Sequence, residues 1–455
     1  MIRTQPLPQL ILFVLLCVVK RSVGHNPISD YSSCPVYLTI SSNSKNVKDS
    51  PILINWGPAC ENPPKWIGLY DKDPSISNDN PRAYIETQRK PDGIFETNVT
   101  IGQIKLPDGW NRGDVLKEPP KQNGGKCLPF YVAAFDAKTL RSIDCLKIQP
   151  NWMKSNKHLM DVPLKNMFIP GTHCSGCFYK KSKAQNVLVE KFGFTQNFDV
   201  WTQLVLGIRY LDISLGFNAK HDDRRNQANK FWVVNDNLFI TPISYILEDV
   251  KKFVLLSQEL VIIEFHQFPI DFNRERHIQF LKYLENKLGD IAFINDHSSN
   301  SYDLTINQMK TNGRLLLITY NEPEMEKETD IIWPCWKRFS TKDLKQTEIR
   351  EYMRKVFSRK YEGSPDEQIG WSFFGRQSVE SSYMDGYSLL TSRERANYIN
   401  HNISIWLGGT WSLSANVVAL DYFYNTNLVD MAIHTNHHKS SQTTDLVSFD
   451  MVDDG

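Results

Sequence analysis

The chain has 455 residues, of which 41% are hydrophobic and 23% are charged, a composition that is ordinary for a globular protein. This length gives room for two or three domains. The formal net charge of +1 provides neither a basic surface for nucleic acid nor a strong field toward anionic membranes, so we expect no nucleic-acid partner.

The N-terminus has the pattern of a secretory signal peptide. Arg3 precedes an apolar run at 10–19, and the small residues Ser22 and Gly24 follow it. The run is too short to span a bilayer comfortably, and no later stretch has the length and apolar character of a membrane helix. We therefore expect residues 1–24 to be a signal peptide and the mature protein to be soluble, secreted and extracellular.

Residues 25–150 are expected to form an all-β domain. Short segments rich in β-branched and aromatic residues alternate there with Pro, Asn, Gly and Asp, a spacing that is typical of a β-sandwich. One segment, Trp-Ile-Gly-Leu-Tyr at 66–70, resembles a β-sandwich module that precedes some phosphoinositide-processing domains. The alternative is a purely structural or docking module.

The cysteines agree with an oxidising compartment. Cys17 lies in the expected signal peptide, and the next four cysteines, all before residue 150, predict two disulfides, for which three pairings are open. Two more form a C-x-x-C sequence, where we prefer a local disulfide because neither a second zinc-ligand pair nor a thioredoxin-like context is evident. Cys335 is left over. The predicted disulfide cysteines are Cys34, Cys60, Cys127, Cys145, Cys174 and Cys177, and the predicted glycosylation acceptors are Asn98 and Asn402.

Strand and helix patterns alternate after about residue 151. Near-continuous apolar strands are expected at 208–213, 260–265, 314–320 and 416–424, with amphipathic helices between them, and this alternation favours a parallel sheet. If such a sheet closes into a (β/α) barrel, the C-terminal ends of its strands are where the chemistry would lie. A polar tail follows at 441–455.

The stretch 165–177 brings a histidine to such a position. Apolar residues at 167–169 fit a short buried strand, which Pro170 and Gly171 are expected to end. His173 then lies on a turn just past the strand, where a scaffold can aim its side chain into a cleft. A histidine held in a loop hydrogen bond is the alternative.

Three ordered motifs carry a family resemblance. They are Ile-Pro-Gly-Thr-His at 169–173, Gly-Ile-Arg-Tyr-Leu-Asp at 207–212 and Leu-Val-Ile-Ile-Glu-Phe-His-Gln-Phe at 260–268. Together they resemble the X-domain of phosphatidylinositol-specific phospholipase C (PI-PLC), and above all the small X-domain-containing proteins of animals. The similarity runs from about 164 to about 436. It implies an α/β fold in which an irregular (β/α) TIM-type barrel at 151–440 follows the smaller β-sandwich domain.

The resemblance also implies a phosphoric diester hydrolase. In that family an inositol hydroxyl attacks the neighbouring phosphodiester, which requires a general base, a general acid, and positive charge or a metal on the phosphate oxygens. His173 matches the base. Asp421 falls where bacterial members carry the carboxylate that orients this histidine, although a helix or loop cap is its structural alternative.

The sequence departs from the family at two places. Asn235 aligns with the second histidine, and a side-chain amide cannot donate a proton at neutral pH. Asp236 with a raised pKa, His221 or His266 are the alternatives. Cys174 and Ser214 replace the residues that hold calcium or neutralise phosphate in the family, so we expect no cofactor, calcium included.

The remaining polar motif residues are assigned to substrate binding, with structural roles as alternatives. Arg209 would otherwise be an ion-pair partner in the barrel bottom or wall, and His266 a hydrogen-bonded residue near the core. These substrate-binding candidates are Asp212, Arg209, Glu264 and His266.

Three functions stay open at this point. The first is a secreted hydrolase of inositol phospholipid or a related phosphodiester, with weak or lost activity. The second is a pseudoenzyme that binds a phosphoinositide head group or a protein on the same barrel. The third is a secreted (β/α) protein with unrelated chemistry. The expected partner is an inositol phospholipid or inositol-phosphate head group, with transient contact to a membrane surface, and the oligomeric state is not predicted.

Overall fold

A computed structural model of the chain describes residues 34–57, 60, 62–90, 92–113, 125–178, 187–220, 230–358, 369–376 and 391–449. The predicted signal peptide at 1–24 lies outside these residues, as does His221. Within them, no helix combines the length and the apolar character needed to cross a membrane.

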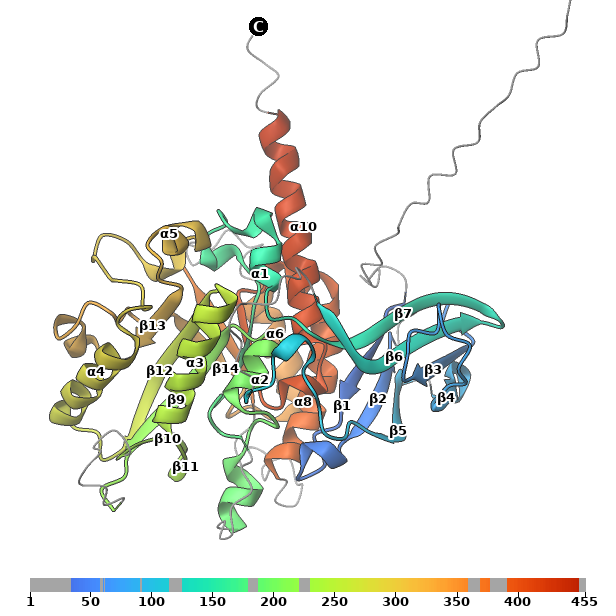
Figure 1. Cartoon of the computed structure of the whole chain (residues 1–455), viewed down its shortest axis with the longest axis horizontal. Helices are drawn as coiled ribbons and strands as arrows, with labels where there is room; N and C mark the ends of the chain where they lie inside the picture. The colour runs from blue at the N-terminus through green and yellow to red at the C-terminus, as the bar shows by residue number, and fades with distance from the viewer. Residues whose placement is uncertain are drawn as a thin grey trace, which may run out of the picture.

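The predicted all-β region is present as two antiparallel sheets, which lie at one end of the molecule (Figure 1). Alternate residues face inward, and Ile54, Ile67 and Val132 from the two sheets belong to one hydrophobic cluster. The first sheet has the order β1 (Val36–Ile40), β2 (Pro51–Trp56), β5 (Ile94–Thr100), and the second has the order β4 (Ala83–Glu86), β3 (Trp66–Tyr70), β6 (Lys126–Asp136), β7 (Thr139–Ile148).

The predicted disulfides are confirmed, and the structure settles their pairing. Two lie in the β region, Cys34–Cys60 and Cys127–Cys145, and the second joins the neighbouring strands β6 and β7. The C-x-x-C sequence forms the local disulfide Cys174–Cys177. Cys335 is unpaired.

The two predicted glycosylation asparagines differ in their surroundings. Asn98 is exposed on β5. Asn402 is half-buried within a helix, where its Nδ2 donates to the carbonyl of Tyr398 at 2.9 Å. Glycosylation of either residue stays a prediction.

A larger sheet makes up the rest of the fold. Its parallel strands run in the order β14-β15-β16-β8-β9-β12-β13, and the hairpin β10-β11 adds antiparallel to β9. Their bounds are β8 (Ile169–Thr172), β9 (Tyr210–Phe217), β10 (Phe231–Asn235), β11 (Leu238–Pro242), β12 (Val261–Ile270), β13 (Leu316–Tyr320), β14 (Lys337–Ser340), β15 (Trp371–Gly375) and β16 (Val417–Leu420).

The sheet is a half-barrel. Strands β13 and β14 form its two ends and are not paired with each other among the described strands. Only isolated parallel bridges, Ala292–Leu316 and Thr319–Trp333, extend β13 beyond its pairing with β12 among the described residues. The predicted alternation of strands and helices is confirmed, whereas closure of the barrel is not seen in the described part of the chain.

Helices cover the outside of this sheet, with α3 and α4 beside β9 and β12 in Figure 1. Helix α3 begins after Pro242, as predicted, and buries Ile246, Val250 and Phe253, which share one helical face. The helices are α1 (Trp152–Ser155), α2 (Val200–Val205), α3 (Ile243–Ser257), α4 (Arg274–Leu288), α5 (Ile306–Thr311), α6 (Gln346–Ser358), α8 (Ser392–Trp406), α9 (Ser412–Ser414) and α10 (Leu428–Phe449).

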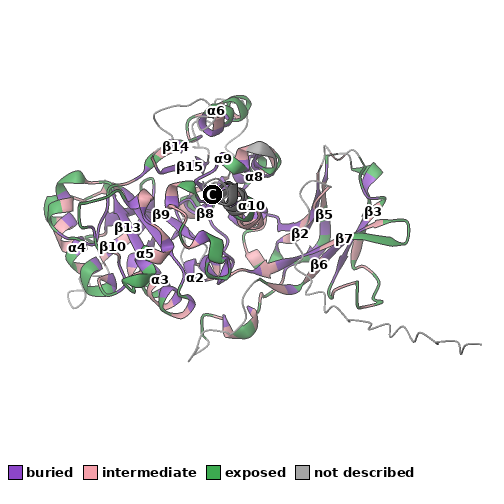
Figure 2. Cartoon of the chain, turned by 90° about the horizontal axis from the view of Figure 1, so that it is seen from above, coloured by how far each residue is buried: buried purple, intermediate pink, exposed green. Residues whose placement is uncertain are grey.

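The β region and the half-barrel pack against each other. Figure 2 shows buried residues in both parts, and one hydrophobic cluster includes residues from each. Buried hydrogen bonds cross the boundary: Trp201 Nε1 donates to the carbonyl of Trp110 at 2.7 Å, and Asn425 Nδ2 donates to that of Ile40 at 3.1 Å.

Candidate active site

The first motif continues as a strand rather than ending at its proline. Strand β8 includes Pro170 and Gly171, so the predicted stop at these residues is wrong. The Pro170 carbonyl accepts from Arg209 N at 3.0 Å, which ties the strand to its neighbour. A Cβ atom on Gly171 would lie 3.0–3.1 Å from Tyr210, so glycine allows the close approach of β8 and β9. His173 follows directly at the C-terminal end.

His173 is held between a carboxylate and a guanidinium. It is 3% exposed, its Nδ1 lies 2.6 Å from Asp421 Oδ1, and its Nε2 lies 2.6 Å from Arg376 Nη1. A carboxylate only accepts and a guanidinium only donates, so Nδ1 carries the proton and Nε2 presents its lone pair. Burial and the charge of Arg376 lower the pKa of His173, so its imidazole is neutral near pH 7.

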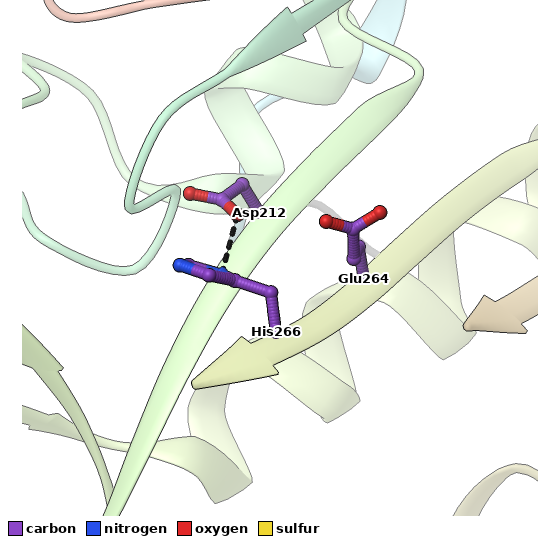
Figure 3. Close-up of side chains that lie close together, drawn as sticks. All are labelled: Asp212, Glu264 and His266. Atoms are coloured by element: carbon purple, nitrogen blue, oxygen red, sulfur yellow. Dashed lines mark ion pairs between the residues drawn. The ribbon is translucent and has the colours of Figure 1, made fainter. Parts of the chain in front are cut away.

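Asp212 on β9 lies between two imidazoles. Its Oδ2 is 3.9 Å from His173 Nε2, and its Oδ1 is 2.7 Å from His266 Nδ1 on β12 (Figure 3). The backbone N–H of Cys174 also donates to Oδ2 at 3.1 Å. Burial alone would raise the pKa of Asp212, but the charges of His266 and Arg338 outweigh it and hold that pKa well below its usual range.

Arg338 on β14 bridges two buried carboxylates. Its Nη1 donates to Asp212 Oδ1 at 3.0 Å and also pairs with Glu264, which is opposite Asp212 in the strand register. The Tyr210 hydroxyl donates to the second oxygen of Glu264 at 2.6 Å. Burial would lower the pKa of Arg338, but the two carboxylates raise it overall, so the guanidinium stays charged.

These carboxylates are also the candidate metal ligands. Asp212, Glu264 and His266 each offer one ligand atom, and these atoms lie within 4.8 Å of one another. The residues fit a cation only in part, because the Arg338 guanidinium already contacts both carboxylates. A metal ion would have to displace it. The expectation that no calcium is needed stays a prediction.

The side chain of Asn235, at the position expected for the general acid, points to the backbone of a π-helical segment and, among the described residues, makes no hydrogen bond to the His173 site. Asn235 ends β10, and its Nδ2 donates to the carbonyls of Phe192 at 3.1 Å and Gly193 at 3.3 Å. Its amide therefore holds the π-helical segment η6 (Val189–Gly193). Asp236 is exposed on the hairpin turn, 3.6 Å from Lys342 Nζ.

Arg209 lies at the N-terminal end of β9, and its side chain makes its hydrogen bonds away from the site formed by His173, Asp421 and Arg376. It is fully buried, and its Nε and Nη2 donate to Glu259 Oε2 at 3.0 and 2.8 Å. Its other N–H groups donate to backbone carbonyls, so this arginine has the contacts of a structural ion-pair partner and not of a substrate-binding residue. The carbonyls are those of Gln149, Pro150, Leu204 and Ile208.

Sequence reasoning missed the two arginines of the site. Arg338 lies in the short, partly exposed strand β14, in a region that carries no family motif. Arg376 follows the apolar run of β15 directly. The rule that pointed to His173, a polar residue at the C-terminal end of a buried strand, would have found Arg376.

The chain is similar in sequence to several known proteins. The chain is 24% identical to human PI-PLC X domain-containing protein 1 over 217 residues, which cover 42% of this chain and 63% of that protein. It is 24% identical to bovine PI-PLC X domain-containing protein 3 over 209 residues, covering 40% and 61%. The matches thus span less than two thirds of these relatives. No family model matches the chain.

Solved structures match this chain at low sequence identity. The phosphatidylinositol-specific phospholipase C of Listeria monocytogenes is 15% identical, with a TM-score of 0.47, and the match covers 63% of this chain and 98% of that one. A mutant of the Staphylococcus aureus enzyme is 15% identical, also with a TM-score of 0.47, covering 63% and 97%.

Proposed function

We propose that this chain, which is related to the PI-PLC X-domain-containing proteins, is a secreted phosphoric diester hydrolase. Its substrate is an inositol phospholipid or a related phosphodiester with a neighbouring hydroxyl. The observation that carries the proposal is the ordered set Asp421–His173–Arg376, in which a neutral imidazole is oriented on one side and faces a cation on the other. The disulfides support the secretory assignment.

His173 is the general base. Asp421 holds its Nδ1–H, so the Nε2 lone pair is available to take a proton from the attacking hydroxyl. In this structure Nε2 accepts from Arg376. A substrate hydroxyl would replace that donor and release the guanidinium to the adjacent phosphate, for which its planar donor geometry is well suited.

His266 is the general acid in this proposal, in place of Asn235. It lies across the Asp212 carboxylate from His173, and that carboxylate can pair with an imidazolium. Its Nε2 lies 3.4 Å from Ser214 Oγ. The proton would pass from His266 to the departing alkoxide.

Arginine supplies the positive charge that the reaction needs on phosphate. Arg376 contacts the base and Arg338 the paired carboxylates, while Arg395 lies within electrostatic range of Asp421 and Arg376. Preorganised charge of this kind typically contributes on the order of 100- to 1,000-fold in rate.

A second candidate function is head-group binding without turnover. It is favoured by Asn235, which stands at the family position of the acid and is committed to the carbonyls of η6. In that case the arginines would hold an anionic head group or partner, and His173 would serve only as a hydrogen-bonding residue.

One experiment separates the two. The mature protein is incubated with phosphatidylinositol vesicles, and water-soluble inositol phosphates are measured. The hydrolase releases cyclic inositol phosphate, His173→Ala abolishes the release, and His297→Ala, an exposed histidine outside the cluster, leaves it unchanged. Vesicle binding with no release identifies the binding module. Neither binding nor release rejects both functions.

A further inference from the structure

A second group of histidines lies on the outside of the fold. Four of the eleven histidines gather where α10 packs against the short turn η4 (Lys157–Leu159). Within this group, His434 and His438 are one helical turn apart on α10, with the i, i+4 spacing that places two side chains on one face. His158 on η4 is within electrostatic range of His437.

The imidazoles of His434 and His438 approach each other with their Nε2 atoms. Their Nε2 atoms lie 3.1 Å apart, and the rings meet edge to face, with centroids 4.5 Å apart. Two nitrogens bound to one zinc ion at 2.0–2.1 Å with a tetrahedral angle lie roughly 3.3 Å apart. The separation of the two Nε2 atoms is therefore close to that of a metal-bound pair.

The helix is held firmly at this turn. Asn436 is fully buried, and its side chain accepts from Phe168 N and donates to Phe168 O, both at 2.8 Å. Lys439 Nζ donates to the carbonyl of Ala415 at 2.9 Å. Because these residues face the sheet from the opposite side of α10, the backbone that carries the histidine pair is fixed before any ion binds.

We propose that His434 and His438 form a binding site for zinc or another divalent transition metal that prefers imidazole. In the metal-free pair, one Nε2–H is shared between the rings. On binding, the donor ring moves this proton to its Nδ1, and both Nε2 lone pairs bind the ion, with water completing the coordination. No net proton is released from neutral rings. The site is separate from the Asp212 cluster.

Zinc binding to the untagged, chelator-treated mature protein tests the site by titration calorimetry. The unaltered chain and the exposed-histidine control His297→Gln are expected to bind zinc with equal affinity. His434→Gln and His438→Gln are each expected to bind at least tenfold more weakly, about 1.4 kcal/mol. Zinc should raise the melting temperature of the unaltered chain and of His297→Gln only.

Three results would overturn the site. One is no uptake of zinc by the unaltered chain. Another is unchanged affinity in both His434→Gln and His438→Gln. The last is loss of uptake only in His266→Asn, which would place the ion at the Asp212 cluster. Melting in the presence of chelator shows that each variant is folded, so a lost site is not mistaken for a lost fold.

Discussion

Nδ1 of His173 lies 2.6 Å from Oδ1 of Asp421, although 248 residues separate the two in the chain. Strand pairing accounts for this contact, because β8 and β16 are neighbours in the sheet and both side chains follow the C-terminal ends of their strands. The carboxylate fixes the tautomer in which Nε2 can accept a proton.

Asp421→Asn should therefore reduce turnover strongly while keeping the fold. An amide can offer its own N–H to Nδ1 and so stabilise the wrong tautomer, and we expect kcat to fall on the order of 100- to 10,000-fold. Release of inositol phosphate measures this. Asp430→Asn, at a carboxylate paired with Lys147, is the matched control. Full activity in Asp421→Asn would remove the carboxylate from the mechanism.

The pH dependence of kcat/KM should change when the charge of Arg376 is removed. His173 acts as a base only when neutral, so kcat/KM rises with pH through its pKa, which burial and Arg376 lower from the ordinary 6.5. Arg376→Gln removes this charge, so the pKa of His173 should rise and the acid limb should move to higher pH. A pH–rate profile of both proteins tests the shift, and an unmoved limb contradicts it.

The same lowered pKa has a consequence for stability. The unfolded chain binds a proton at this histidine below about pH 6.5, while folded His173 stays neutral to lower pH. Stability should therefore fall as pH drops below 6.5, and the fall should be smaller in Arg376→Gln. Urea unfolding at several pH values gives the free energy of unfolding. If the free energy of unfolding of Arg376→Gln fell more steeply with decreasing pH than that of the unaltered chain, the expected effect of Arg376 on the pKa of His173 would be wrong.

Arg338→Ala should turn the carboxylate pair into a cation site. Asp212 and Glu264 are fully buried, and removing their common partner should cost about 3–5 kcal/mol of stability. Added calcium or manganese should then raise the melting temperature of Arg338→Ala but not of Arg354→Ala, an exposed arginine on α6. If added metal leaves the melting temperature of Arg338→Ala unchanged, Asp212 and Glu264 do not form a cation site in the absence of this guanidinium.

Substitutions at Asn235 and His266 decide between the two candidate functions. If Asn235 marks a lost acid, Asn235→His should increase turnover by about 100-fold or more, and His266→Asn should have little effect. If His266 is the acid, His266→Asn abolishes turnover and Asn235→His does not increase it. Initial rates on the same vesicles make the comparison. Asn235→Ala controls for loss of the bonds to η6.

Arg209→Met should affect stability and not chemistry. Its guanidinium pairs with buried Glu259, and breaking the pair leaves an uncompensated carboxylate, at a cost of about 3–5 kcal/mol. Urea unfolding measures this loss. The folded fraction should keep its KM, and a rise in KM without a loss of stability would restore Arg209 as a substrate-binding residue.

Much of this fold could be predicted because local patterns carry it. The helix after Pro242 and the apolar strand at 260–265 follow from periodicity, and the resemblance carried by the motif at 169–173 pointed to His173. Local sequence patterns do not show which strands pair with each other. The position of Arg376 after an apolar strand was visible in the sequence, but its contact with His173 depends on the pairing of β15 with β16. Arg338 reaches the site only because β14 pairs with β15, which no local pattern indicates.

The direction of the Asn235 side chain could not be predicted from the sequence for a different reason. Alignment placed it at the position of a missing histidine, but its direction depends on the carbonyls of Phe192 and Gly193 in a π-helical turn. Disulfide pairing was equally open, because Cys34–Cys60 and Cys127–Cys145 follow from strand positions that four cysteines alone do not specify.

The pairing of β8 with β16 bears on how the protein matures. During synthesis, β8, which precedes His173, is made some 248 residues before its partner β16. Contacts between such distant segments form late in folding. A nascent chain that has delivered β8 but not yet β16 therefore lacks the His173–Asp421 pair on which the proposed chemistry depends.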